Sequence, residues 1–168
     1  MSEVIYKKIP QSDEWQVRDL ISKVLGGLER PEFFIPYADW ELDSLFDENY
    51  ALLDGAYING KLVGMAQLYV KQEMLEEFKQ AMDIADKKVA ELGGNLILPE
   101  GRGQGIMFNM IQKQLADAQK FGFDYVIAMA HPDNIASLKS LKKLGMEYVN
   151  TCTVANGYLR DTYWIKLS

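Results

Sequence analysis

The residues best placed to do chemistry in this 168-residue chain lie in a glycine-rich turn, the run Gly-Arg-Gly-Gln-Gly at residues 101–105. A short apolar stretch ending at Leu98 precedes the turn, and apolar residues recur at helical spacing from Ile106 onward. A turn that opens directly into a helix leaves backbone N–H groups unpaired, and the helix dipole makes that end electropositive. With Arg102 as a cation beside these groups, the turn is expected to bind phosphate or another anion.

Two other interpretations of the turn follow from its glycines. It could be only a tight connection, because glycine permits chain reversal. It could also belong to a dinucleotide-binding oxidoreductase with the pattern Gly-x-Gly-x-x-Gly. The second interpretation fails because the third glycine would fall on Ile106. About twenty residues further on, where an acidic residue should contact the ribose, the chain reads Phe121 to Phe123.

A second polar run, Pro132-Asp133-Asn134, follows the predicted buried strand Phe123–Ala130. The helix expected next, Ile135–Leu144, is followed by Gly145, and Asn134 or Asp133 is a plausible N-cap for it. A buried strand at Phe123–Ala130 implies a parallel neighbour reached by a right-handed crossover. Each of the two motifs therefore lies between the end of a strand and the start of a helix.

These two motifs resemble those of the GCN5-related N-acetyltransferase (GNAT) superfamily, whose acyl-CoA-binding pattern is Arg/Gln-x-x-Gly-x-Gly/Ala. Arg102 through Ile106 fit this pattern, and Met107 stands where a small residue is usual. The second motif, from Asn134 to Gly145, has the order and separation of the family's later motif. The resemblance covers residue 95 to the C-terminus and, less closely, the preceding hairpin. The first fifty residues match only in their order of elements.

The resemblance implies acetyl-CoA or coenzyme A as co-substrate, with no metal. The pyrophosphate would lie on the N–H groups of Gly103–Met107 beside Arg102, and the pantetheine arm would extend the strand at Leu96–Leu98. Asn134 and Ser137 would hydrogen-bond the pantetheine. The cofactor-binding residues expected in this way are Leu96, Ile97, Leu98, Arg102, Gly103, Gln104, Gly105, Ile106, Met107, Asn134 and Ser137.

The activity implied by the resemblance is direct transfer of an acetyl group to the primary amine of a small molecule or protein, in a ternary complex. The amine must lose a proton, and Glu91 and Asn95 are the candidates near the expected place. Seven positions after Asn134, where many members carry a tyrosine that protonates the leaving thiolate, this chain has Leu141. Leu141 motivates an alternative function, a non-catalytic regulatory module that binds acyl-CoA.

Composition limits the remaining classes of function. The net charge of −6 argues against nucleic acid or an anionic membrane as the main partner and mildly favours a cationic acceptor. Cys152 is the only cysteine and His131 the only histidine, which excludes a disulfide within the chain and cysteine-based or histidine-rich metal sites. Since no signal peptide or run of eighteen apolar residues is evident, we expect a cytoplasmic protein, with a homodimer left open.

The elements form one expected α/β domain, residues 1–168, which some schemes would class as α+β. The resemblance implies a GNAT-like mixed, mostly antiparallel, twisted sheet, with a central splayed parallel strand pair and flanking helices. A helix N-capped by Ser12 and one over Tyr37–Phe46, with Trp40 and Leu45 inward, are expected to precede a hairpin turning at Asn59-Gly60. Expected strands cover residues 4–9, 51–58, 61–70, 95–98, 123–130, 146–154 and 158–167, the last two joined at Ala155-Asn156-Gly157.

The longest expected helix covers Lys71–Leu92 and is closed by Gly93-Gly94. It carries apolar residues along one side, including Met74, Phe78 and Val89. Because it is longer than a link between two strands needs to be, we interpret it as an insertion.

Overall fold

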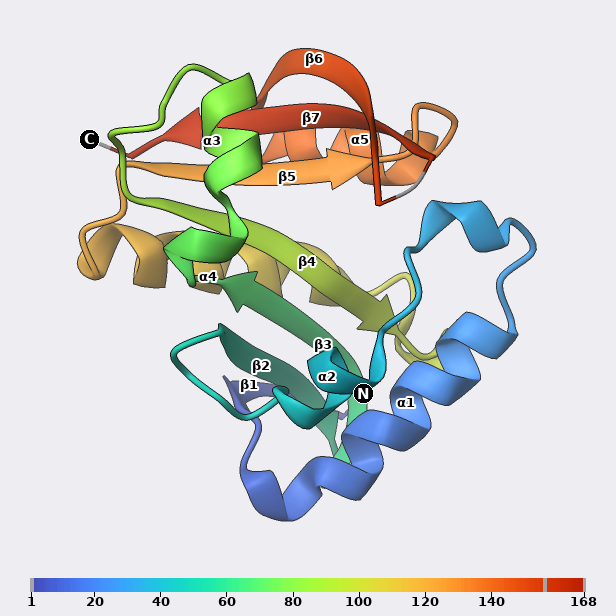
Figure 1. Ribbon diagram of the computed structural model, residues 1–168. Coiled ribbons are helices and arrows are strands. Elements are labelled where there is room, and N and C mark those ends of the chain that lie inside the picture. Colours follow the sequence, from blue (N-terminus) through green and yellow to red (C-terminus); the bar gives the residue numbers. More distant parts are fainter. Residues whose placement is uncertain (1, 156, 168) are drawn as a thin grey trace.

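The computed structural model describes residues 2–155 and 157–167, which form a seven-stranded sheet of order β1-β2-β3-β4-β5-β7-β6 (Figure 1). Neighbouring strands in the described residues run antiparallel except for β4 and β5, which are parallel. The mixed, mostly antiparallel sheet expected from the sequence is therefore confirmed. The strands are β1 Val4–Lys8, β2 Ala51–Ile58, β3 Lys61–Tyr69, β4 Val89–Ile97, β5 Tyr125–Ala130, β6 Glu147–Val154 and β7 Tyr158–Lys166.

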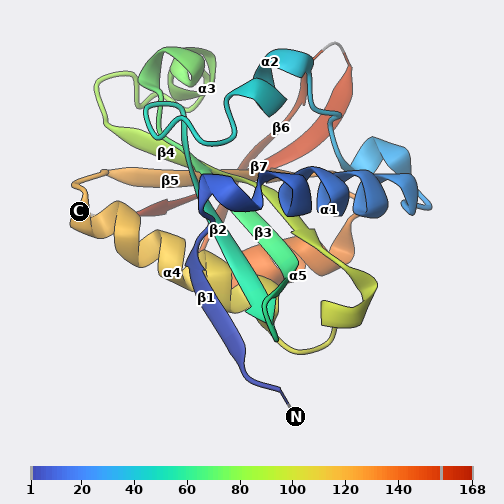
Figure 2. The same ribbon diagram turned by 90° about the horizontal axis from the view of Figure 1, so that it is seen from below.

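Helices cover both faces of this sheet. Figure 2 shows α1, α2 and α3 on one face and α4 and α5 on the other. Their bounds are α1 Glu14–Gly26, α2 Asp39–Asp43, α3 Glu76–Ala81, α4 Ile106–Lys120 and α5 Ile135–Lys143. None of the helices described is long and apolar enough to cross a membrane.

The two expected hairpins are present. Asn59 and Gly60 turn β2 into β3 with φ of 50° and 79°, the positive values that a tight two-residue turn requires. The second hairpin pairs β6 with β7. Of the turn expected there, Asn156 lies outside the described residues.

The expected helix Lys71–Leu92 is wrong beyond its first half. Helix α3 ends at Ala81, and Val89–Leu92 belong to β4, where they pair in parallel with Tyr125–Ala128. Val89 and Ile127 pack together with Met82 and Ile84 of the connecting loop. The apolar spacing of this segment fits a helix, but pairing with a buried strand decides its conformation. The segment is therefore a short helix followed by a central strand rather than an inserted helix.

Gly93 and Gly94, expected to end that helix, instead form a β-bulge in the middle of β4. Gly93 pairs with Gln67 and Leu96 pairs with Met65, so Gly94 and Asn95 together oppose a single residue of β3. Gly94 has φ of +58°, a conformation that glycine adopts without strain. The extra residue reverses which face the following side chains occupy.

The clusters on the two faces show this reversal. Before the bulge, Ala90 and Leu92 pack with the α4 and α5 residues. After it, Leu96 packs with the α1 residues on the opposite face. Pairing between β4 and β5 also ends at this point, with Leu92 opposite Ala128. The two parallel strands therefore separate beyond the bulge, as the sequence resemblance implies.

The N-terminal third differs from expectation in detail. Helix α2 spans only Asp39–Asp43, and Trp40, expected inward, is 49% exposed, whereas Leu45 is buried as expected. Trp40 instead packs edge-on against Tyr50 at the surface. The N-cap of α1 is Asp13 rather than Ser12, because a short 3-10 turn, Gln11–Asp13, precedes the helix.

Candidate functional site

The glycine turn joins the short 3-10 turn Pro99–Gly101 to α4. Gly103 and Gly105 have φ of +77° and +72°, and an added Cβ at either position would meet no atom within 4 Å. Gly105 is the N-cap of α4, and no side chain caps this end. Backbone N–H groups in this turn and in the first turn of the 15-residue helix α4 therefore face open space. The positive end of the helix dipole lies at the same place.

The second helix N-terminus is capped as the sequence predicts. The Asn134 side chain accepts a hydrogen bond from the Ser137 N–H at 3.3 Å. This cap orients the first turn of α5, because one unpaired donor of the helix end is satisfied by the side chain. Asn134 and Ser137 are both partly buried, so each keeps surface toward the space beside β5.

A groove of about 630 Å³ brings these two helix ends together between the separated strands β4 and β5. Arg102 at its edge is exposed and forms no ion pair within the described part of the chain. The groove is lined by most of the cofactor residues expected from the sequence: Leu96, Ile97, Arg102, Gly103, Gly105, Ile106, Met107, Asn134 and Ser137.

Two of the expected cofactor residues do not line the groove. Leu98 is 3% exposed, packs with α1, and donates its N–H to the Val63 carbonyl at 2.8 Å. The Gln104 side chain is exposed and donates to the Glu100 carbonyl at 3.2 Å. Both therefore hold the turn in place from outside the groove.

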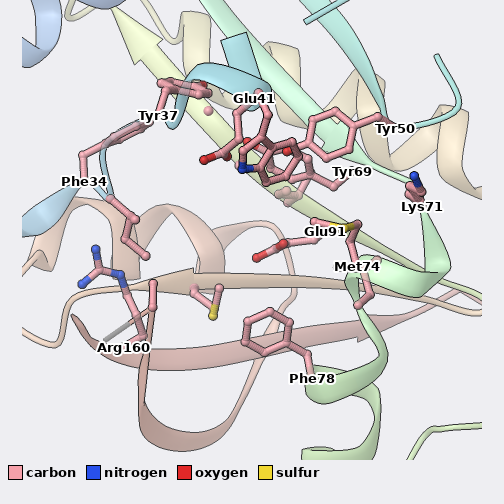
Figure 3. Close-up of a pocket in the computed structure, with 18 of the residues that line it drawn as sticks. Phe34, Tyr37, Glu41, Tyr50, Tyr69, Lys71, Met74, Phe78, Glu91 and Arg160 are labelled. Atoms are coloured by element: carbon pink, nitrogen blue, oxygen red, sulfur yellow. The ribbon is translucent and has the colours of Figure 1, made fainter. Parts of the chain in front are cut away.

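A second cavity, of about 390 Å³, lies on the α2 and α3 face of the sheet. Aromatic side chains from distant segments form most of its wall, among them Phe34, Tyr37, Tyr50, Tyr69 and Phe78 (Figure 3). The sequence alone offers Phe34 and Tyr37 either as walls of an acceptor pocket or as core residues, and it does not bring them together with Tyr50, Tyr69 and Phe78, which lie far away along the chain. Phe34, Gly93, Gly94 and Met129 line both this cavity and the groove, so the two spaces meet at the bulge in β4.

Glu91 projects from β4 into this second cavity (Figure 3). Withdrawal of its carboxyl group from bulk water raises the pKa of Glu91 to about 7, and the negative charge of Glu41 adds to the effect. Within the described residues, the Glu91 carboxyl group has no hydrogen-bond or ion-pair partner. Near neutral pH, Glu91 therefore exchanges a proton readily.

Asn95, the other expected catalytic residue, is part of the bulge and lines the groove instead of the cavity. Its Oδ1 atom is buried without a hydrogen-bond partner in the described structure. A buried acceptor of this kind is costly unless a bound molecule supplies a donor. The structure thus separates Glu91 and Asn95 between the two spaces.

Three hydrogen-bonded side chains, those of Gln67, Tyr37 and Tyr69, pack against the bulge at Gly94. Gln67, which is fully buried, accepts hydrogen bonds at its Oε1 atom from the hydroxyls of Tyr37 (2.5 Å) and Tyr69 (3.0 Å). A Cβ at Gly94 would lie 2.3 Å from that same Oε1 atom and 2.7 Å from the Tyr37 hydroxyl. Only glycine therefore fits between these side chains and the bulge.

Arg160 is a cavity residue that the sequence reading missed. It is 3% exposed, lies on β7, and donates to the carbonyls of Leu159 (2.7 Å) and Glu32 (3.0 Å). Burial disfavours its charged form and lowers the pKa of Arg160. The sequence offered one signal for Arg160. Residues two apart in a strand share a face, so Arg160 lies on the same face as Thr162 and Trp164, at a position where an arginine is unusual.

Leu141 occupies a core position rather than the edge of the groove. It is 7% exposed and packs with Leu138 and Met146 in the cluster beneath α5. No hydroxyl is therefore supplied at the position where the family commonly has tyrosine. Among the described residues, no group of three or more histidine, cysteine, aspartate or glutamate side chains is arranged to hold a metal ion.

Comparison with known proteins adds a family and a fold. The model of the acetyltransferase (GNAT) family matches residues 14–146. No curated protein sequence matches the chain. Among solved structures, an N-acetyltransferase from Staphylococcus aureus Mu50 is 14% identical with a TM-score of 0.76, the alignment covering 99% of each chain.

Two further structures are similar over nearly the whole chain. The ribosomal-protein-S18-alanine N-acetyltransferase from Escherichia coli is 13% identical with a TM-score of 0.72, covering 99% of this chain and 95% of that one. A chain of the NatC complex bound to Gag peptide and CoA is 15% identical with a TM-score of 0.74, covering 99% of both. At these identities the structures show a shared fold.

Proposed function

Because the chain belongs to the GNAT family of acetyltransferases, we propose that it transfers the acetyl group of acetyl-CoA directly to a primary amine in a ternary complex. The observation that carries this proposal is the meeting of two cavities at one bulge. A groove with unpaired N–H groups and Arg102 lies on one side, and a cavity with an unpaired Glu91 lies on the other.

The groove fits coenzyme A in its donor groups and in its shape. N–H groups at the start of α4 and the Arg102 cation suit a pyrophosphate, and no side chain obstructs Gly103 or Gly105. Beyond Leu92, the edge of β4 that faces β5 has no pairing in the described residues. N–H and C=O groups on this edge suit the amides of a pantetheine arm, together with Asn95, Asn134 and Ser137.

Acetyl-CoA, when bound, supplies the acetyl group as a thioester. Glu91 would accept the proton that the amine loses while its C–N bond forms and the thioester C–S bond breaks. An N–H group on the free edge of β4 would stabilise negative charge on the thioester oxygen. The thiol has an ordinary pKa of about 8.5, so the thiolate is a tolerable leaving group even where Leu141 replaces a proton donor.

A second candidate function is a regulatory module that binds acyl-CoA without turnover. Burial of Leu141 in the core favours it, because α5 then offers no tyrosine hydroxyl to the leaving group. Glu91 weighs against it, since an unpaired carboxyl group in an apolar cavity lowers stability without a role in a module that only binds. We therefore place the enzyme first.

The test combines thermal unfolding with release of CoA. We expect acetyl-CoA and CoA, but not NAD, to stabilise the folded protein, by about 2.7 kcal/mol at a hundredfold excess over the dissociation constant. Acetyl-CoA and a panel of primary amines should then release CoA. Stabilisation without turnover would select the regulatory module, and the absence of stabilisation by either CoA species would refute the site itself.

A further inference from the structure

We propose that the acceptor is a zwitterion, an amino acid with a large apolar or aromatic body, whose carboxylate binds Arg160 while its amine lies at Glu91. This inference rests on the proposed function and names the substrate class of the same site. It is carried by two groups of opposite charge, the buried Arg160 and the half-buried Glu91, which line one cavity and have no charged partner among the described residues.

Arg160 has more hydrogen-bonding capacity than the protein uses. A guanidinium group has five N–H donors, and two of them bond to the carbonyls of Leu159 and Glu32. No carboxylate in the described residues lies within ion-pair distance of it. A cation that is 97% buried among neutral partners is costly, and a bound carboxylate would offset that cost.

The two acidic side chains that line the cavity, Glu41 and Glu91, differ in whether the protein supplies a hydrogen-bond partner. Glu41 accepts a hydrogen bond from the Ala38 N–H at 3.0 Å and so caps α2. Glu91 has no comparable partner in the described part of the chain. Glu41 is therefore occupied by the fold, and Glu91 is the acidic group available to an amine.

Strand register places Glu91 and Arg160 on one face with a gap between them. Glu91 pairs with Ile127, which pairs with Trp164, so these three side chains share a face of the sheet. Arg160 lies four residues from Trp164 on β7 and projects to the same face, about 13 Å along the strand. The two charged side chains line the same cavity and do not form an ion pair with each other, so a molecule that carries both charges would bridge them.

The wall between the two charges is apolar. Phe34, Met129 and Phe78 belong to the cavity lining. Figure 3 shows Phe78 and Tyr69 on the Glu91 side of the cavity. A small hydrophilic amino acid would leave this surface unfilled, whereas an aromatic or branched apolar side chain would cover it. Lys71, the other cation of the lining, is exposed at the rim.

The test compares amino acids with amines that lack only the carboxylate. CoA release from acetyl-CoA is measured with L-phenylalanine, L-tyrosine, L-tryptophan, L-leucine and L-methionine. Each is paired with its decarboxylated amine and with its carboxamide. We expect at least one amino acid to exceed both of its counterparts in kcat/KM by about 30-fold or more, the effect of a buried charge pair.

Variants then assign this preference to one residue. Arg160→Gln should raise KM for the preferred amino acid by about 30-fold and leave its decarboxylated amine nearly unaffected. Arg160→Lys should retain part of the preference, because the charge remains while the planar fork is lost. Lys71→Gln is the matched control, because it removes the same charge from the same cavity at an exposed position. The shift in unfolding temperature with CoA verifies that each variant is folded.

The outcomes separate the inference from the proposed function. Turnover of amines or peptide amides at least as fast as of the amino acids would overturn the zwitterion while leaving the acetyltransferase intact. Equal losses in Arg160→Gln and Lys71→Gln would also overturn it, because they would indicate general electrostatics. No CoA release with any compound would contradict the proposed function itself, and the inference would fall with it.

Discussion

The groove and the cavity meet at the same bulge, but backbone groups form most of the groove and side chains form most of the cavity. The groove is formed largely by backbone: glycines with positive φ, the open edge of β4 and two helix N-termini. The cavity is formed by side chains from the segment before α2, from α2 and α3, from Tyr50 just before β2, and from strands β3, β4, β5 and β7. A surface formed by backbone, such as the one we propose to bind phosphate, can therefore be recognised in a short run of sequence, whereas an aromatic cavity depends on the complete fold.

This difference predicts where each space is sensitive. Changes of side chain should affect the cavity most strongly, because Glu91 and Arg160 act through their own charged groups. The groove should depend on glycine and on backbone geometry, and should tolerate most changes of side chain. Five predictions test this contrast.

The largest effect is expected for Glu91→Gln. Loss of the general base should lower kcat/KM for CoA release by about 10²–10⁴-fold, with acetyl-CoA binding unchanged. In the wild type, kcat/KM should rise as the pH increases through about 7, because only the ionised carboxylate accepts a proton. Glu41→Gln is the comparison: it keeps Glu91, so the rise in kcat/KM should persist but shift to lower pH, because the negative charge that raises the pKa of Glu91 is removed. A pH profile that is unchanged in Glu91→Gln would exclude Glu91 as the base.

The same substitution should stabilise the protein at pH 8. The folded-state pKa of Glu91 lies above its ordinary value of 4.5, so its contribution to stability is full below 4.5 and is lost as the pH rises to about 7. Glutamine avoids this loss, and the free energy of unfolding should increase by about 1–3 kcal/mol. Denaturant unfolding at pH 4 and pH 8 measures it. Equal effects at both values would contradict burial of the charge.

In the groove, Gly105→Ala should weaken CoA binding by about 10–100-fold. An alanine Cβ would occupy the open space beside the N–H groups and displace a charge-assisted hydrogen bond. Gly60→Ala is a close match, since Gly60 also has positive φ and an unobstructed Cβ position but lies in a distant hairpin. Both variants should lose similar stability, and only Gly105→Ala should lose affinity in calorimetric titration. Equal affinities would show that the turn does not contact the ligand.

Arg102→Gln should have a smaller effect, about fivefold in the dissociation constant of CoA. Arg102 is exposed, so salt and water screen its attraction to phosphate. The loss should diminish at high salt, which distinguishes charge from packing. Lys87→Gln removes an exposed cation elsewhere and should leave affinity unchanged. A hundredfold loss at Arg102 would mean that the groove depends on side chains as much as the cavity does.

The smallest effect is expected for Asn134→Ala, about 1 kcal/mol of unfolding free energy from loss of the cap that bonds the Ser137 N–H. Ser140→Ala, which removes a hydroxyl bonded within the same helix, should cost less. Urea unfolding measures both. A larger loss in Ser140→Ala would show that the cap is not what stabilises the start of α5.

Local motifs in the sequence predicted parts of the fold that border the groove. The glycine turn and the Asn134 cap are each determined within a few residues, by positive φ or by a side-chain acceptor, whereas the separated strand pair was implied by the family resemblance. The Asn59-Gly60 turn was predicted for the same reason. Leu98 and Gln104 lie next to the groove without lining it, because a motif identifies neighbours in sequence but not the direction of each side chain.

The errors lie where distant contacts decide the structure. Val89–Leu92 fit a helical pattern until they pair with β5, and Gly93-Gly94 could equally end a helix or form a bulge. Trp40 fit an inward position, but α2 is too short to bury it. Arg160 was missed because the alternation along β7 assigns it to one face of the sheet but does not show that this face borders the cavity. Glu91 was selected by its proximity to the motif, and its unpaired, buried environment appears only in three dimensions.

The bulge in β4 has a consequence for how this protein could diversify. Glu91, before the bulge, lines the cavity, and Asn95, within the bulge, lines the groove, so one strand borders two spaces through separate positions. Substitutions among the aromatic side chains of the cavity would change the preference for the amine acceptor, while the glycine turn would continue to bind the proposed acetyl donor. Because of this one-residue insertion, the side chains that border the cavity can change without altering the strand positions that border the groove.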